Sequence, residues 1–203
     1  LLTKAQLDFR VLSVDIDETK QVDELPKDYI ERMVATKAAA AIEQLNQTLN
    51  IDEDSFAESV VILTSDTIGV LPDGKTVLVK PVDREHAYSM WQQMSDNVHE
   101  VWTAVQATRV QLLSKKEGHT PDRIKDFQVV DQQQFTERTE VTFIPLTTQI
   151  MSDYWDSGEP ADKAGGYGIQ GLGAAWVERI NGSYTNVVGL PLAQTLALIK
   201  NMS

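Results

Sequence analysis

Two long β-rich stretches constrain the fold of this chain more than any other feature of its sequence. Residues 98–113 are rich in β-branched side chains, and Val101 and Thr103 alternate onto one side of the predicted strand. Residues 127–143 form a second long strand region with a polar middle. The charged segment between them, residues 114–126, predicts a loop. Together with helical patterns elsewhere, these strands favour a mixed α/β fold with long antiparallel strands.

The first part of the chain predicts a strand followed by a long helix. Residues 9–14 predict a strand that runs into an acidic turn. A helix is expected from Pro26, because proline is favoured in a first turn. Its apolar positions have the spacing of one helical face: Ile30, Met33, Val34, Ala41, Ile42 and Leu45. Lys37 falls on this same face, where it either extends its stem over the core or has a specific task.

A second strand leads to the first candidate for chemistry. The apolar run at residues 60–63 predicts a short buried strand that ends at residues 64–67. Asp66 would then stand just past a strand, a common place for a metal ligand or a base in α/β sheets. A cap of a turn or helix explains an aspartate there equally well. Further along, residues 72–75 predict the turn of a hairpin.

Two shorter helices are expected from their capping residues. Asp83 is the expected N-cap of a helix with one apolar face, made of Ala87, Met90, Trp91 and Met94. Thr147 or Thr148 is expected to cap a second short helix that ends near Gly158. A last helix is expected over about residues 191–200.

Net charge and the missing cysteines exclude several classes of function. The 203 residues include 30 acidic and 18 basic side chains, a formal net charge of −12. A surface this acidic repels a phosphate backbone, which argues against general nucleic-acid binding but not against a small phosphorylated ligand. Without cysteine there is no disulfide, zinc–thiolate site, iron–sulfur cluster or thiol nucleophile. No apolar run reaches the ~18 residues of a membrane span, so no membrane partner is expected and a cytoplasmic protein is predicted.

Charged residues supply two further candidate sets. Asp15, Asp17 and Glu18 offer hard oxygen ligands, and Mg²⁺ is commonly held by one or two carboxylates together with substrate phosphates and water. A solvated run of charge is the alternative explanation. Lys37 and Lys80 could bind phosphates as compact point charges. For either lysine alone, an amphipathic side chain at the surface explains the pattern as well.

Glycines concentrate near the end of the chain. Seven of the eleven glycines lie within residues 165–189, which allows the backbone to approach a ligand closely. Gln170 lies among them and could offer both a donor and an acceptor to a base edge. The segment is neither a Walker loop nor a dinucleotide fingerprint, because the required lysine and leading strand are missing. A strand at residues 174–180, a turn and a return arm are predicted to follow.

Read in chain order, these motifs resemble the Maf family of nucleoside triphosphate pyrophosphatases. The resemblance covers nearly the whole chain and rests on Asp17-Glu18-Thr19, Tyr29 through Ala38, Ser65-Asp66-Thr67, Lys80-Pro81, Asp162 through Gly165, Gly168 through Gly173, Asn181 through Tyr184 and Val187 through Pro191.

The resemblance implies both a fold and a reaction. The implied fold is a two-lobed α/β body with a long mixed sheet, flanking helices and a cleft between the lobes, forming one domain over residues 1–203 and often a homodimer. The implied reaction is hydrolysis of dTTP, UTP and related non-standard pyrimidine nucleotides to the monophosphate and pyrophosphate, with Mg²⁺ or Mn²⁺. The alternative is a nucleotide-binding regulator of septum formation with little catalysis. Pyrophosphate release would separate the two.

The resemblance also assigns roles to individual residues. It makes Asp66 the catalytic proton acceptor and, together with Glu18, a ligand of the divalent metal. It places substrate binding and specificity on four residues: Thr67, Gln170, Lys37 and Lys80.

One family motif has no counterpart in this chain. The family opens with a strand and a phosphate-binding Ser-x-Ser-Pro-Arg-Arg loop, whereas Leu1-Leu2 aligns just after that loop. The chain is therefore expected to be a fragment of a longer protein.

Overall fold

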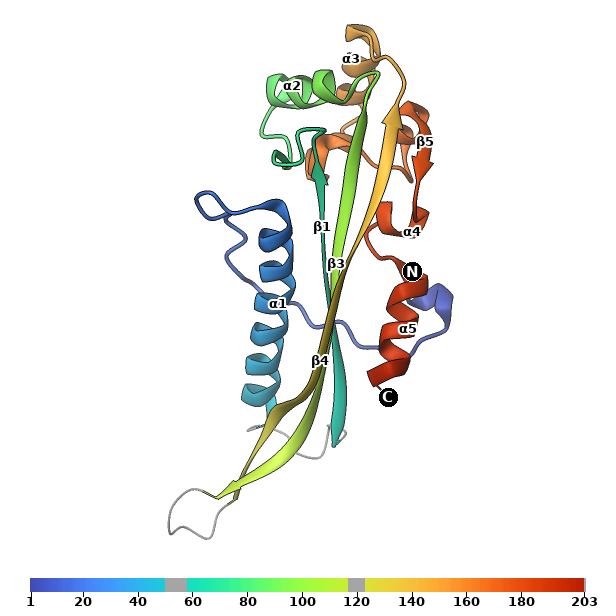
Figure 1. Ribbon diagram of the computed structural model, residues 1–203. Coiled ribbons are helices and arrows are strands. Elements are labelled where there is room, and N and C mark those ends of the chain that lie inside the picture. Colours follow the sequence, from blue (N-terminus) through green and yellow to red (C-terminus); the bar gives the residue numbers. More distant parts are fainter. Residues whose placement is uncertain (50–57, 117–122, 203) are drawn as a thin grey trace.

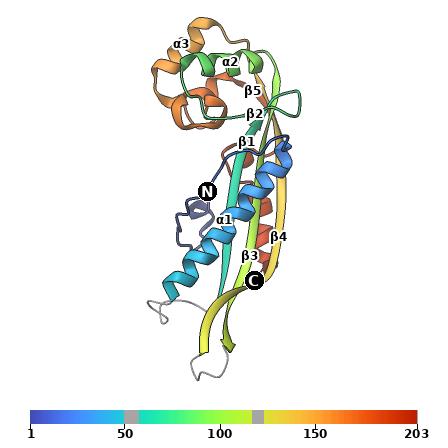
Figure 2. The same cartoon turned by 90° about the vertical axis from the view of Figure 1, so that its left-hand side faces the viewer.

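The computed structural model describes residues 1–49, 58–116 and 123–202. Figure 1 shows a long, narrow sheet whose faces carry helices, with a group of shorter helices gathered around one end. Turned by a quarter, the sheet is seen with α1 (Pro26–Leu49) running along it (Figure 2). The α/β class with flanking helices is thereby confirmed. None of the helices in the described part of the chain combines the length and apolar composition needed to cross a membrane.

Five strands form the sheet in the order β2-β1-β3-β4-β5. Their bounds are Val77–Leu78 (β2), Ser59–Val70 (β1), Val98–Lys116 (β3), Arg123–Phe143 (β4) and Val177–Asn181 (β5). All four pairings between these strands are antiparallel, where the family resemblance implied a mixed sheet. The longest pairing joins β3 to β4, which follow each other in the chain, and such neighbours run antiparallel because the chain reverses direction between them.

Helices cover both faces of the sheet centre. From α1, Ile30 and Val34 pack on one face against Trp102 and Ala104 of β3. On the other face, the last helix, α5 (Leu192–Met202), packs Leu198 and Met202 against Val105 and Ala107 of β3. Residues 101–108 of β3 are therefore all buried, although their side chains point to alternate faces.

The helices at the end of the sheet enclose an aromatic core, and we call this part the aromatic lobe. It contains α2 (Arg84–Met94), α3 (Thr148–Asp156) and short 3₁₀ turns within residues 159–176. Both predicted caps are confirmed, since Asp83 accepts from the His86 amide and Thr147 from the Ile150 amide. Trp91 lies at the centre with Trp176 and Tyr154 against it, at ring-centroid distances of 4.9 and 5.6 Å.

The strand predicted at residues 9–14 is wrong. These residues are described without regular structure, and Val11 is 85% exposed. Alternating apolar residues form a strand only where a neighbouring strand can accept their backbone hydrogen bonds. Here the segment pairs with none of the five strands of the sheet.

The predicted end of the second strand is also wrong, since β1 continues through residues 64–67. Asp66 pairs with Ala104 of β3 in the middle of the strand. The polar side chains stay inside because their neighbours satisfy them. Thr64 Oγ1 donates to the Val34 carbonyl of α1 at 2.9 Å, and Ser65 Oγ donates to the Gly189 carbonyl at 3.2 Å.

Two further boundaries differ from prediction. The charged segment 114–126 is strand through Lys116 and again from Arg123, and the rest of the predicted loop lies outside the described residues. The predicted return arm after β5 is instead the short helix α4 (Tyr184–Val187). Ser183 starts that helix because its hydroxyl accepts from the Asn186 amide.

Candidate active site

Three of the predicted site residues meet at one point beneath α1. The Lys37 ammonium lies 2.6 Å from Asp66 Oδ1 and 3.1 Å from Glu18 Oε1. The Lys37 and Asp66 side chains are only 18% and 16% exposed, whereas that of Glu18 is 57% exposed. The lysine therefore bridges a half-buried carboxylate on β1 and a solvent-facing one on the segment before α1.

Regular structure fixes the buried half of this cluster. Side chains alternate along β1, so Thr64 and Asp66 both face α1. The Thr64 bond to the Val34 carbonyl holds helix and strand together one turn away from Lys37. The position of Lys37 on the apolar face of α1 thus directs its stem across the core to Asp66.

The charges of the cluster are strongly coupled. Burial raises the pKa of Asp66 above its usual value, and the Lys37 hydrogen bond only partly opposes that effect. Burial alone would lower the pKa of Lys37, but the bonds and charges of Asp66 and Glu18 outweigh it and raise that pKa. Lys37 thus stays an ammonium at neutral pH. Two of its three donors face the carboxylates, leaving one for an anionic ligand.

Glu18 is placed by contacts of its backbone and of the neighbouring residues. Tyr29 Oη of α1 donates to the Glu18 carbonyl at 3.0 Å, and Arg32 donates to the Thr19 carbonyl at 3.0 Å. Arg32 also binds both oxygens of Glu24, at 2.6 and 2.8 Å. The acidic segment is thereby fastened to the first turns of α1, with the Glu18 side chain beside Lys37.

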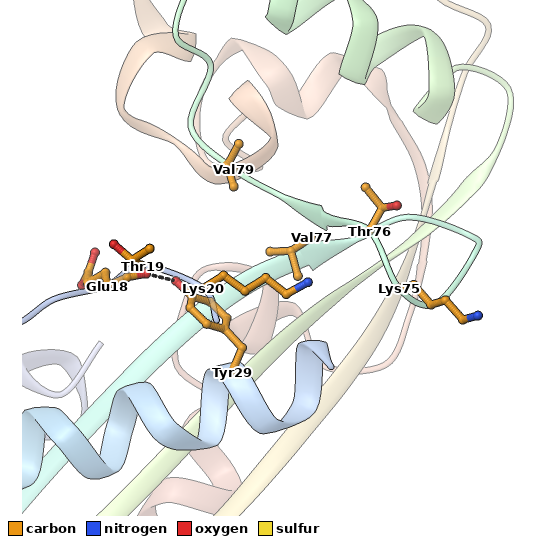
Figure 3. A pocket seen from close by; sticks show the side chains of 8 residues that line it. All are labelled: Glu18, Thr19, Lys20, Tyr29, Lys75, Thr76, Val77 and Val79. Carbon is orange, nitrogen blue, oxygen red and sulfur yellow. Dashed lines mark hydrogen bonds between the residues drawn. The ribbon is translucent and has the colours of Figure 1, made fainter. Parts of the chain in front are cut away.

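A cavity of about 570 Å³ adjoins this cluster (Figure 3). Glu18 and Tyr29 lie on one side and the β1–β2 hairpin on the other, with Lys20 extending between them. The complete lining is Glu18, Thr19, Lys20, Tyr29, Lys75, Thr76, Val77 and Val79. Glu18 belongs to both the cavity and the cluster, whereas Lys37 and Asp66 do not line the cavity, so Glu18 is the residue that connects the two.

Lys80 lies near the same place but is exposed. It follows β2, and its charge partly opposes the burial that raises the pKa of Asp66. At Asp162 the Lys163 hydrogen bond is the main cause that lowers the pKa, and the charge of Lys80 adds to it. The glycine-rich segment lies next to Lys80, because the Gly165 amide donates to the carbonyl of the preceding residue, Val79, at 3.0 Å. Lys80 therefore stands between the cluster and the aromatic lobe.

The remaining two predicted residues lie apart from the cluster. Thr67 points to the opposite face of β1 from Asp66, where Thr67 Oγ1 contacts Thr103 Oγ1 at 2.9 Å and donates to the Gly189 carbonyl at 3.3 Å. Gln170 is exposed on the glycine-rich segment of the aromatic lobe. Their predicted contacts with substrate stay predictions.

The donors at the cluster suit a divalent cation that arrives with a ligand. Glu18 and Asp66 both contact the Lys37 ammonium, so a divalent cation held by these two carboxylates would compete with Lys37 for them. Within the described residues, no three His, Asp or Glu side chains form a metal site. Two carboxylates completed by phosphates and water are the usual Mg²⁺ environment, and this set fits it.

Analysis of the sequence missed the residues that hold the acidic segment. Tyr29 and Arg32 are three residues apart, so they share one face of α1 at its start. That spacing, close in the chain to the acidic segment at residues 15–18, was the signal that could have predicted these contacts. Their partner Glu24 carried none, because its ion pair joins residues eight apart across a helix start.

The fold and the site together define a mixed α/β protein with a lysine-bridged carboxylate pair beside a cavity, a class suited to phosphorylated ligands. The chain belongs to the Maf family, whose model, described as Maf-like protein, matches residues 1–202.

Curated relatives cover the chain completely. It is 68% identical to the dTTP/UTP pyrophosphatase of Psychrobacter arcticus over 210 residues, which include all of this chain and 90% of that protein. The dTTP/UTP pyrophosphatase of Psychrobacter cryohalolentis is 66% identical over 208 residues, with 100% and 92% covered. That of Shigella dysenteriae is 38% identical over 203 residues, with 100% and 87% covered.

Proposed function

We propose that this protein hydrolyses dTTP and UTP to the nucleoside monophosphate and pyrophosphate. The single observation that carries the proposal is the Lys37 bridge between Asp66 and Glu18 beside a cavity. The names of the curated relatives support this activity over the alternative of a regulator with little catalysis.

Asp66 is the proposed general base. Water attacks the α-phosphorus, the bond from that phosphorus to the bridging oxygen of the β-phosphate breaks, and pyrophosphate leaves. The proton lost by the water passes to the Asp66 carboxylate. Burial raises the pKa of Asp66, which makes it a stronger proton acceptor than an ordinary aspartate.

Positive charge near Asp66 would hold the triphosphate. The third donor of Lys37 and the exposed ammonium of Lys80 are the proposed phosphate contacts. Glu18 and Asp66 would hold Mg²⁺ or Mn²⁺, which supplies charge neutralisation of the phosphates when bound.

Gln170 and Thr67 are proposed to select the nucleobase of the substrate. The Gln170 amide is exposed and offers a donor and an acceptor to a pyrimidine edge. Thr67 holds the Gly189 carbonyl, so its influence would pass through the turn before α5.

Product analysis tests the reaction. The chain would be incubated with dTTP, UTP or GTP and Mg²⁺, and the products separated by ion-exchange chromatography. We expect monophosphate and pyrophosphate, with dTTP and UTP preferred over GTP. Orthophosphate and a diphosphate would contradict the proposed bond cleavage. A chelator added to a second sample tests the need for the metal.

Three coarser expectations belong to the same proposal. Residues 1–203 are proposed to form a single domain, the protein to act in the cytoplasm, and two copies to associate. Sedimentation of the purified chain would measure the last of these.

A further inference from the structure

The residues on either side of Gln170 are held by two side chains that the proposed reaction does not use. Glu159 Oε2 accepts from the Leu172 amide at 2.8 Å, and Glu159 Oε1 accepts from the Gly173 amide at 3.2 Å. Tyr154 Oη accepts from the Gly168 amide at 3.2 Å. Gln170 therefore lies between two tethered positions of the backbone, while its own side chain is exposed.

Glu159 and Tyr154 also bind each other, and we call them the clamp. Tyr154 Oη donates to Glu159 Oε1 at 2.7 Å. The carboxylate thus accepts three hydrogen bonds, two of them from backbone amides. Burial raises the pKa of Glu159, but these hydrogen bonds outweigh it and lower that pKa overall, so the group is charged at neutral pH.

The glycine spacing around Gln170 matches the clamp. A Cβ on Gly171 would lie 2.3 Å from Glu159 Oε1, and a Cβ on Gly173 would lie 2.8 Å from Tyr154 Oη. Real Cβ atoms do not approach other atoms so closely, so a side chain at residue 171 would displace the Glu159 carboxylate, and one at residue 173 would also press on the Gly168 backbone. The sequence pattern suggested that these glycines leave room for a ligand, whereas Gly171 and Gly173 leave room for the side chains of Glu159 and Tyr154.

The clamp is anchored in the aromatic core of its lobe. The Tyr154 ring packs at 4.5 Å from that of Trp176 and 5.6 Å from that of Trp91. The Trp91 indole in turn donates to the Gly165 carbonyl at 3.0 Å, which fixes the start of the glycine-rich segment. Gln170 is therefore presented on a loop whose backbone is hydrogen-bonded on both sides of it.

We propose that Glu159 and Tyr154 are positioning residues that set the preference for pyrimidine nucleotides by fixing the backbone that presents Gln170. The inference rests on the proposed function, because it needs Gln170 to read the base. An amide can tell one base edge from another only if its donor and acceptor are held in place, and binding energy lost to ordering a loose loop lowers discrimination.

Selectivity measured in a set of variants tests the clamp. The wild-type chain, Gln170→Ala, Glu159→Gln and the double variant would be assayed for kcat and KM with UTP and GTP. Glu159→Gln should lower the ratio of kcat/KM for UTP to that for GTP by about tenfold, mainly through the KM for UTP. In the Gln170→Ala background the same change should add nothing, since the amide that it positions is gone.

Two further variants separate positioning from folding. Tyr154→Phe keeps the ring among Trp91 and Trp176 but removes the hydroxyl, and should lower the ratio by about threefold. It also carries the test if Glu159→Gln fails to fold. Asp153→Asn is the matched control, because it removes a neighbouring carboxylate that contacts Gln149 rather than the clamp; its ratio should equal that of the wild type.

Each failure has its own signature. Unchanged selectivity in the folded clamp variants, or a loss that adds in full to that of Gln170→Ala, would overturn the clamp's role while leaving the proposed function intact. Unchanged selectivity in Gln170→Ala would overturn the base-reading role of Gln170 and the inference with it. A wild-type chain without activity on UTP would overturn the proposed function itself.

Discussion

Two carboxylates in this molecule are held in contrasting ways. Asp66, beneath α1, is bound by the ammonium of Lys37, which also contacts Glu18. Glu159, in the aromatic lobe, is bound by two backbone amides and a tyrosine hydroxyl that is itself packed in a core. In the proposed function, the carboxylate that is bound by a side chain is the one that meets water and the metal. The Glu159 carboxylate has a structural role, since its release would break the bonds to the Leu172 and Gly173 amides that hold the loop.

The largest expected effect comes from neutralising the Asp66 carboxylate. Asp66→Asn should lower kcat by ~10²–10⁴-fold, because a base that takes a proton from water typically contributes that much. Stability should change little, since Lys37 keeps its bond to Glu18. Rate assays and thermal melts on the same sample measure both.

A capping variant provides the matched control for Asp66→Asn. Thr147→Ala removes the cap of α3 and should lower stability by about 1 kcal/mol without affecting kcat. If Asp66→Asn behaved like Thr147→Ala, with a lower melting temperature and a normal rate, Asp66 would belong with the structural carboxylates and the contrast would collapse.

The next largest effect is expected from adding a methyl group beside the Glu159 carboxylate. In Gly171→Ala the new Cβ would displace the Glu159 carboxylate and break its bonds to the Leu172 and Gly173 amides, at a cost of about 1–3 kcal/mol. Preference for UTP over GTP should fall together with the melting temperature.

Gly74→Ala separates that steric effect from backbone strain. Gly74 has φ +68° but open space around it, so alanine there should cost only about 1 kcal/mol and leave selectivity unchanged. Wild-type melting and selectivity in Gly171→Ala would show that Glu159 moves freely, contrary to the contrast drawn above.

A smaller effect is expected at Thr67, which neighbours Asp66 in sequence but faces away from it. Thr67→Val removes the contacts to Thr103 Oγ1 and to the Gly189 carbonyl, which should cost about 1 kcal/mol. If the hydroxyl also serves base selection, the UTP-to-GTP ratio should shift by about threefold. A stability loss with an unchanged ratio would leave Thr67 a structural residue only.

The sequence predicted elements with strong local signals and missed those fixed by distant partners. The helix from Pro26 and the caps Asp83 and Thr147 were predictable, because their signals lie within a few residues. The course of β1 through Asp66 was not, because α1 and the Gly189 carbonyl are what satisfy its polar side chains. A strand was predicted at residues 9–14 from a local pattern whose necessary partner strand does not exist among the described ones.

The same division applies to the site. The family resemblance singled out Lys37, Asp66 and Glu18, but it gave Lys37 a role in substrate binding and did not predict that Lys37 bridges the two carboxylates. The clamp residue Glu159 gave no signal, because its partners are backbone amides, which every sequence contains. Polar residues that bind backbone groups are the part of a site that residue types alone do not reveal.

The smallest effect is expected at Glu24, a second carboxylate with a structural role, which is bound by Arg32 of α1. Hydrogen bonds from Arg32 lower the pKa of Glu24 from its usual 4.5 to about 2. A group whose pKa is depressed by folding stabilises the protein above its unfolded pKa, and that contribution disappears as the pH falls towards the folded value. The wild type should therefore melt above Glu24→Gln at pH 6, and the difference should shrink between about pH 4.5 and 2.

Glu24→Gln also tests whether Glu24 helps to hold Glu18 in place for metal binding. Arg32 would keep the Thr19 carbonyl but lose its anchor, so the segment that carries Glu18 should loosen. We expect the Mg²⁺ concentration for half-maximal rate to rise by about two- to threefold with kcat nearly unchanged, because metal binding would have to order that segment. Lys27→Gln, which removes only the exposed ion pair to Glu31, is the control and should change neither quantity. An unchanged Mg²⁺ dependence in Glu24→Gln, alongside the expected pH-dependent melting, would mean that the bonds from Tyr29 and Arg32 to the backbone suffice to place Glu18 without Glu24.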